Sequence, residues 1–228
     1  MILGIDEAGR GPVIGPLVIC GVWLQTSRQK KLLEMGVRDS KAFGSSARAQ
    51  KRRAQLAAYI RQQASGVVLL SVDAAEVDRR VRLGELNLLE QELACAIISQ
   101  GPLARKIIAD GARLFSPLRA TFPQLSARDG ADSTSPAVAA ASILAKVERD
   151  ALYQNIVEPW EQELGPIAGG GYANSATAAF LRAYFARYGQ LPPEVRRSWS
   201  WSVLQEINRL QAGLPPLPRA EQLSLPTM

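Results

Sequence analysis

The chain opens with Ile2-Leu3-Gly4-Ile5-Asp6-Glu7-Ala8-Gly9-Arg10-Gly11-Pro12, a short apolar run that ends in two acids and a glycine-rich turn. An apolar run bounded by turn residues predicts a buried strand. Carboxylates at the end of such a strand need water or a cation, and the glycines let the backbone turn tightly or approach a ligand. On these residues alone, Asp6 and Glu7 are either the solvated start of a loop or ligands of a metal site.

The composition limits the chemistry that such a site can use. The chain has 228 residues, with 27 Lys and Arg against 21 acids, a net charge of +6, and no histidine. The lack of histidine excludes Ser-His triads, histidine metal sites and histidine acid–base catalysis. A metal site must therefore use oxygen ligands, which favours Mg²⁺ or Mn²⁺. The modest basic excess favours a polyanionic partner.

Two features predict a cytoplasmic location. Cys20 and Cys95 are the only cysteines, and we expect both to be free and buried, as in a reducing compartment. The N-terminal residues include acids rather than a basic segment before a long apolar run, so we expect no signal peptide. No apolar run approaches the ~20 residues that a membrane span requires, so we expect no membrane association.

Further apolar runs predict an α/β fold with a mixed sheet flanked by helices. Strands are expected at 17–23, 67–72, 107–110 and 125–128, and helices at 47–64, 86–97, 137–150, 153–163, 176–188 and 201–211. The short link between the first two strands predicts an antiparallel pair. Ser135 and Pro136 are typical of a helix start. The basic run at 51–53 is more typical of a solvated helix face than of a nucleic-acid contact.

The domain organisation is expected to have three parts. Residues 1–188 form the main domain and residues 189–211 a small helical extension. Residues 212–228 are rich in proline and polar residues, which predicts a mobile tail.

Two further acids belong with the opening pair. Asp110 also ends an apolar strand, and Asp132 precedes an alanine-rich helix. Converging carboxylates repel one another and persist only with cations or retained protons. Two divalent ions ~4 Å apart are the recurring arrangement for phosphodiester cleavage. Because neighbours on a strand face opposite sides, either the strand breaks after Asp6 or Glu7 contributes its backbone carbonyl.

The opening motif, followed by Gly15-Pro16, closely resembles that of ribonuclease HII, the type 2 ribonuclease H. Later motifs follow in family order: Asp39-Ser40-Lys41, then Asp132-Ser133 with Pro136, residues 140–147 and Arg149-Asp150, then Gly171-Tyr172 and Arg196-Arg197-Ser198-Trp199. Val195 stands where many bacterial members have histidine, so the C-terminal motifs look closer to archaeal members. Ala112 replaces a frequent asparagine and Ala173-Asn174 a common Gly-Thr, which leaves fine substrate preference open.

The resemblance implies a ribonuclease H-like fold and cleavage of RNA in RNA–DNA hybrids and at single ribonucleotides in duplex DNA, leaving 5′-phosphate and 3′-hydroxyl ends. It implies roles in ribonucleotide removal and RNA primer removal, and we expect a monomer. By similarity, Asp6 bridges two Mg²⁺ or Mn²⁺ ions, and Glu7, Asp110 and Asp132 complete the sites. The implied substrate contacts are the Gly9-Arg10-Gly11 backbone and Tyr172 for the ribose 2′-hydroxyl, with Lys41, Ser142 and Lys146 for phosphates.

Three other functions compete with this interpretation. A dinucleotide-binding oxidoreductase would need a glycine in place of Ile14, so its fingerprint fails. A non-catalytic nucleic-acid-binding protein explains the basic charge but not the acids at strand ends. Within the same fold, type 3 ribonuclease H is the nearest alternative, and the intact Gly9-Arg10-Gly11 favours type 2.

Overall fold

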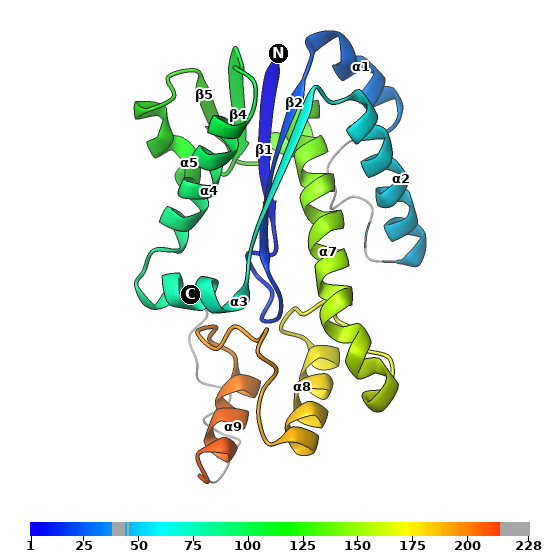
Figure 1. Cartoon of the computed structure of the whole chain (residues 1–228), viewed down its shortest axis with the longest axis vertical. Coiled ribbons are helices and arrows are strands. Elements are labelled where there is room, and N and C mark those ends of the chain that lie inside the picture. The colour runs from blue at the N-terminus through cyan, green and yellow to red at the C-terminus, as the bar shows by residue number, and fades with distance from the viewer. Residues whose placement is uncertain (38–43, 45, 215–228) are drawn as a thin grey trace.

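A computed structural model describes residues 1–37, 44 and 46–214 and contains a five-stranded mixed sheet (Figure 1). Its strands are β1 (Ile2–Ala8), β2 (Leu17–Leu24), β3 (Gly66–Val72), β4 (Lys106–Asp110) and β5 (Leu125–Arg128), in the order β3-β2-β1-β4-β5. β2 is antiparallel to β1 and β3, whereas β4 is parallel to β1 and β5. The expected strands and the antiparallel first pair are confirmed.

Helices cover both faces of the sheet (Figure 1). On one face, α1 (Thr26–Glu34), α2 (Ala47–Gln63) and α7 (Pro136–Leu164) share a hydrophobic cluster with β2. On the other face, α4 (Leu86–Gln100) and α5 (Ala112–Phe115), with the 3₁₀ turn Ser116–Ala120, share a cluster with β1, β4 and β5. The helix α3 (Ala74–Arg82) packs against α4. The mixed sheet flanked by helices is therefore confirmed.

The alanine-rich start of α7 lies directly against β1. A Cβ atom built on Gly4 would lie 2.2 Å from the carbonyl carbon of Ala137, so only glycine fits there. The small side chains of residues 139–141 are buried in the same contact. This close approach places the side chains of α7 beside the residues that follow Gly4 on β1.

Two expected helices are one. We expected separate helices at 137–150 and 153–163, but α7 runs without interruption over 29 residues and contains Pro159. No breaker stands between the two segments, and Pro159 removes only one backbone hydrogen bond of the helix. Tyr153 and Val157 of its second half are buried.

The C-terminal helices form a separate cluster below the sheet in Figure 1. The helices α8 (Ser175–Tyr188) and α9 (Ser202–Gln211) pack with the second half of α7 and with Val13 and Ile14. An isolated bridge joins Ile14 to Val195. The turn after β1 is therefore part of the C-terminal cluster as well as of the sheet.

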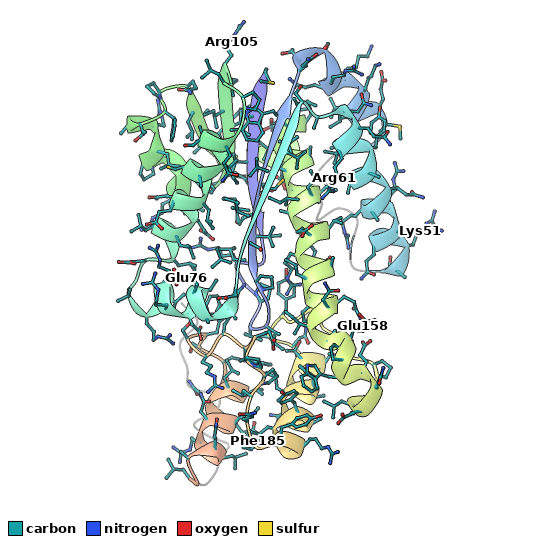
Figure 2. All side chains as sticks on the ribbon, in the orientation of Figure 1. Lys51, Arg61, Glu76, Arg105, Glu158 and Phe185 are labelled. Atoms are coloured by element: carbon teal, nitrogen blue, oxygen red, sulfur yellow. The ribbon has the colours of Figure 1, made fainter. Side chains whose placement is uncertain are left out.

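Several expectations concern the remaining residues. Cys20 and Cys95 are both free, as expected, but Cys95 is only half-buried. Lys51 and Arg105 project from the surface of the molecule (Figure 2). Among the helices that the structure describes, none has the length and apolar character needed to cross a bilayer. Lys41, its motif at 39–41 and most of the expected tail, from residue 215, lie outside the described residues.

Candidate metal centre and substrate pocket

Three aspartates meet at one edge of the sheet. Asp6 lies on β1, Asp110 ends β4, and Asp132 lies on α6 (Ala131–Thr134), and one carboxylate oxygen of each lies within 4.8 Å of the others. β1 and β4 are parallel neighbours, so Asp6 and Asp110 come to the same edge. The backbone N–H of Ala131 donates to Oδ1 of Asp110 at 2.8 Å, which holds α6 against the end of β4. The structure thus brings together three of the four predicted acids.

Glu7 stands apart from these three. β1 stays paired with β2 through Ala8, so the strand does not break after Asp6. Successive strand residues face opposite sides, and among the described residues the group of converging acids does not include Glu7. Glu7 still lines the same cavity, and its backbone N–H donates to Oδ1 of Asp6 at 2.8 Å. Its assignment as a metal ligand therefore stays a prediction.

Burial and charge repulsion dominate the electrostatics of the acids. Burial raises the pKa of Asp6 well above its usual value, the charges of Glu7 and Asp110 raise it further, and a hydrogen bond with Ser142 lowers it. Burial and the charge of Asp110 also raise the pKa of Glu7, while Arg10 lowers it. A bound cation would relieve this repulsion. The all-oxygen donor set fits a hard divalent ion.

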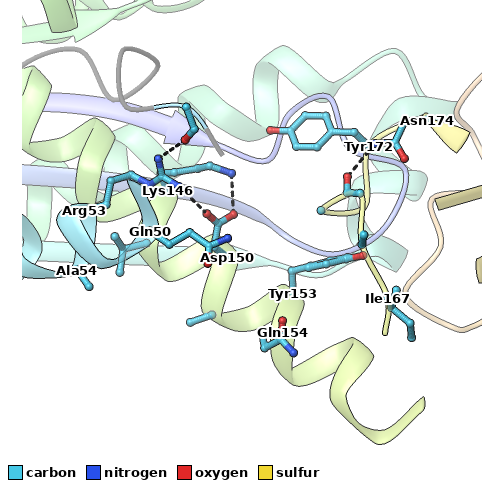
Figure 3. Close-up of a pocket in the computed structure, with 16 residues that line it drawn as sticks. Gln50, Arg53, Ala54, Lys146, Asp150, Tyr153, Gln154, Ile167, Tyr172 and Asn174 are labelled. Atoms are coloured by element: carbon cyan, nitrogen blue, oxygen red, sulfur yellow. Dashed lines mark hydrogen bonds and ion pairs between the residues drawn. The ribbon is translucent and has the colours of Figure 1, made fainter. Parts of the chain in front are cut away.

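The acids open into a cavity of about 480 Å³ lined by Asp6, Glu7, Ala8, Gly9, Arg10, Gly44, Arg53, Asp110, Ser142, Lys146 and Tyr172. A neighbouring cavity of about 820 Å³ shares four of these lining residues, which are Gly44, Arg53, Lys146 and Tyr172 (Figure 3). Every predicted substrate contact that the structure describes lines the first cavity except Gly11, which is exposed beside it.

Tyr172 is a cavity residue and not a core residue. Its side chain is 43% exposed, and its ring projects across the opening from the glycine-rich segment (Figure 3). Lys146 Nζ lies 5.8 Å from the ring centroid, and Arg149 Cζ lies 5.4 Å from it. Lys146 Nζ also donates to Oδ1 of Asp150 at 2.7 Å. The tyrosine ring is therefore accessible to a ligand and flanked by two cations.

The side chain of Arg10 is directed to α4. Its guanidinium forms an ion pair with Glu90 and donates to Oδ1 of Asn87 at 2.7 Å. Glu90 is fully buried, and burial raises its pKa to about 7 although Arg10 lowers it. Because its side chain is engaged with α4, Arg10 offers its backbone to a ligand in the cavity.

The sequence analysis was wrong about Arg53, which it placed on a solvated helix face. Arg53 is 3% exposed, donates to the carbonyl oxygen of Gly44 at 2.6 Å, and lies 4.0 Å from Asp150. The buried face of α2 consists of Ala49, Arg53, Leu56, Ala57 and Ile60. This helical spacing was the available signal, because it puts Arg53 in line with the apolar residues.

Arg149 is a second residue whose role the sequence analysis missed. It is fully buried on α7 and donates to the carbonyl oxygens of Gly170 at 2.6 Å and Ile14 at 3.3 Å. One guanidinium thereby joins the turn after β1 to the glycine-rich segment that carries Tyr172. A charged residue within an alanine-rich, buried helix was the signal, since a buried guanidinium requires partners.

Comparison with known proteins adds independent support. The family model for ribonuclease HII matches residues 3–202. A ribonuclease HII from Methanothermobacter thermautotrophicus is 40% identical over 206 residues, which are 87% of this chain and 96% of that protein. The crystal structure of ribonuclease H2 from Pyrococcus horikoshii OT3 has a TM-score of 0.77 at 30% identity and covers 92% of this chain and 98% of its own.

A third relative is the RNase HII of Archaeoglobus fulgidus, whose structure was solved in a complex with PCNA. It has a TM-score of 0.70 at 34% identity over 86% of this chain and 92% of its own. The similarity to archaeal members is confirmed by these relatives. Together with the aspartate cluster and the adjoining cavity, they show that the chain belongs to the ribonuclease HII family, a metal-dependent family of RNase H enzymes that act on RNA–DNA hybrids.

Proposed function

We propose that this protein cleaves both the RNA strand of RNA–DNA hybrids and duplex DNA at single embedded ribonucleotides, using two Mg²⁺ or Mn²⁺ ions. The observation that carries the proposal is the convergence of Asp6, Asp110 and Asp132, with oxygens within 4.8 Å of one another. The same cavity presents Gly9 and Tyr172, so the acids and a candidate sugar-binding surface adjoin.

The acids are the groups that would hold the ions. Asp6, Asp110 and Asp132 would hold the two ions together with Glu7, and Asp6 would be shared between the two sites. Two such ions, when bound, supply an activated water and stabilise charge on the leaving oxygen. Ser142 forms a hydrogen bond with Asp6 that lowers the pKa of this carboxyl group. It would therefore favour the ionised form of Asp6, which is the form that binds a cation.

The reaction is hydrolysis of one phosphodiester bond. The oxygen of a water molecule bonds to phosphorus, the bond from phosphorus to the 3′ oxygen breaks, and the 3′ oxygen leaves with a proton. The products carry 5′-phosphate and 3′-hydroxyl ends. The converging carboxylates support this chemistry because they provide a site for divalent ions without any histidine.

Selection of a ribonucleotide would rest on the 2′-hydroxyl, which alone distinguishes the two sugars at a given position. The backbone of Gly9-Arg10-Gly11 would contact this hydroxyl, and Tyr172 would pack on the sugar. Lys146, which lines the cavity, would contact a phosphate, and Lys41 is a further candidate outside the described residues. In the cell, we propose removal of ribonucleotides from DNA and of RNA primers by a monomer.

The decisive experiment uses a labelled DNA duplex with one ribonucleotide, a matched all-DNA duplex and an RNA–DNA hybrid. We expect cleavage of the first and third with Mg²⁺ or Mn²⁺, none in excess chelator, and no cleavage of the all-DNA duplex. Mass analysis of the products should find 5′-phosphate and 3′-hydroxyl ends. Hydrolysis in chelator would contradict the metal mechanism, and an intact single-ribonucleotide duplex would restrict the activity to hybrids.

Substitutions of Tyr172 test the sugar contact. Tyr172→Ala removes an exposed ring, so the fold should survive while most cleavage at a single ribonucleotide is lost. A site built around a hydroxyl discriminates strongly, because its polar groups are unpaired when that hydroxyl is absent. Tyr172→Phe, which keeps the ring, is the matched control and should lose only part of the rate. The steady-state cleavage rates of the two variants measure the contribution of the ring. A folded Tyr172→Ala variant that cleaves at the parental rate would show that Tyr172 does not contact the substrate.

A further inference from the structure

The turn after β1 is held from behind by two side chains near the end of the chain. Arg196 donates from Nε to the carbonyl oxygen of Gly15 at 3.0 Å and from Nη1 to that of Arg10 at 3.1 Å. Trp199 donates from Nε1 to the carbonyl oxygen of Gly11 at 3.1 Å. All three contacts use carbonyl oxygens of the turn, and none of the three uses the N–H of Gly11.

The two donors are themselves fixed in place. Arg196 is fully buried, and its guanidinium lies 4.9 Å from the ring centroid of Trp199. Asp78, a buried residue of α3, accepts from the backbone N–H of Arg197 at 2.8 Å and of Ser198 at 3.0 Å. The Arg196–Trp199 segment is therefore anchored to α3 as well as to the turn.

The geometry of the peptide bond, together with these contacts, determines the direction of the Gly11 N–H group. The carbonyl of Arg10 and the N–H of Gly11 belong to the same planar trans peptide and point in opposite directions. Because Arg196 holds that carbonyl on the buried side, the N–H of Gly11 points to the other side. Gly11 is exposed, and a Cβ atom built on it would meet no atom within 4 Å. A sugar can therefore approach this amide closely.

We propose that Arg196 and Trp199 are positioning residues that fix the amide of Gly11 for recognition of the substrate's ribose. The inference rests on the proposed function, in which the Gly9-Arg10-Gly11 backbone reads the 2′-hydroxyl. Neither side chain touches the substrate in this scheme. Their contribution is to keep one peptide plane from rotating, so that its N–H is already aligned when the nucleic acid binds.

The alternative is that Trp199 only fills space among the C-terminal helices, since its ring also packs against their hydrophobic cluster. A packing role and a positioning role for Trp199 predict different effects of its substitution on cleavage. Loss of packing lowers stability and reduces cleavage of all substrates together. Loss of alignment weakens selection of an isolated ribonucleotide most, because a long hybrid offers a ribose in every register.

The test is Trp199→Phe, which keeps an aromatic ring and removes the indole N–H. Trp160→Phe is the matched control, because Trp160 is also half-buried in the C-terminal cluster and lies against Tyr184 and Tyr188. For Trp199→Phe we expect kcat/KM on the single-ribonucleotide duplex to fall roughly three- to tenfold more than on the hybrid, as for one lost hydrogen bond. The control should change both substrates equally.

Arg196→Lys is a second test variant. It keeps the positive charge but cannot donate to the carbonyl oxygens of Arg10 and Gly15 at the same time. Hydrogen exchange of a peptide covering residues 9–15 in the free protein, which needs no catalysis, should be faster in both variants than in the control. Equal loss on both substrates, or unchanged selectivity with faster exchange, would overturn the proposal. Failure of the parent protein to cleave either substrate would instead contradict the proposed function.

Discussion

At the scale of single residues, the buried acidic cluster lowers the stability of the metal-free fold. Asp6 is 5% exposed and Asp132 is 4% exposed, and the pKa of Asp6 is raised by burial and by the charge of Glu7. A carboxylate in such a place destabilises the metal-free fold and is relieved by a proton or by a divalent ion. Residues chosen for metal chemistry are therefore expected to oppose stability.

Asp6→Asn should be inactive yet folded, with a metal-free stability equal to or above that of the parent. The substitution removes a charge that Glu7 and Asp110 repel, and it keeps the shape of the side chain. Thermal unfolding of both proteins in chelator measures this. Glu158→Gln, on the solvent-exposed side of α7 (Figure 2), is the matched control and should change little. Clear destabilisation by Asp6→Asn would make Asp6 a structural hydrogen-bond acceptor.

An alanine substitution should destabilise the fold far more at Gly9 than at Gly11. Gly9 has φ +92, and a Cβ there would lie 2.4 Å from the carbonyl oxygen of Pro16, whereas Gly11 has open space. We expect Gly9→Ala to lower the free energy of unfolding by about 2 kcal/mol or more and Gly11→Ala to change it by less than about 0.5 kcal/mol. Urea denaturation compares the two. Equal effects would mean that the turn relaxes around an added methyl group.

At the scale of elements, the sequence predicted what depends on local pattern and missed what depends on packing between elements. The apolar runs gave all five strands, and an acid followed by glycine marked Asp110 as well as Asp6. The continuity of α7 was missed because we expected separate helices at 137–150 and 153–163, although no breaker stands between them. The burial of Arg53 was missed because a basic run reads as solvated. Both outcomes follow from neighbouring elements that supply the packing and the polar partners.

The contact between α4 and the turn after β1 should make metal-free stability depend on pH. The pKa of Glu90 is raised from 4.5 to about 7 by burial, with Arg10 opposing. A carboxyl group with a raised folded-state pKa stabilises the fold fully below pH 4.5, and this contribution is lost as the pH rises through about 7. We therefore expect stability to fall by up to about 3 kcal/mol between pH 5 and pH 8 from this group.

Glu90→Gln isolates that contribution, because a glutamine does not titrate. Urea denaturation in chelator at pH 5 and at pH 8 should give a smaller difference for Glu90→Gln than for the parent. Glu85→Gln is the matched control, since Glu85 precedes the same helix and is more exposed. Parallel pH profiles for parent and Glu90→Gln would mean that Glu90 stays ionised throughout and is held by Arg10.

At the scale of the whole molecule, basic charge is arranged around the cavities. The chain has a net charge of +6, and Arg53 and Lys146 line both cavities. Lys51 is exposed on α2, whose residues Gln50, Arg53 and Ala54 line the larger cavity. This arrangement favours a phosphate backbone that runs along α2 and α7 toward the acids.

Binding of an RNA–DNA hybrid should therefore weaken steeply with salt. Each phosphate contact releases counterions, so we expect at least a roughly tenfold loss of affinity between about 50 and 200 mM salt. Titration of a labelled hybrid in chelator gives the slope without cleavage. Lys51→Ala should reduce the slope, and Arg105→Ala, a matched exposed cation before β4 at the opposite end of that strand from Asp110, should not. A slope near zero would argue against an electrostatic interface.

The hydrogen bonds from Arg196 and Trp199 to the turn after β1 also have a consequence for folding during synthesis. The bonded residues are separated by 181 to 188 positions along the chain. A nascent polypeptide emerges from the ribosome N-terminus first, so the turn after β1 is made long before the residues that hold it. A message cut short before residue 196 would yield a product that has all four acids but lacks the hydrogen bonds from Arg196 and Trp199 to the turn. Residues 196–199 thus determine when the turn made long before them is held in place.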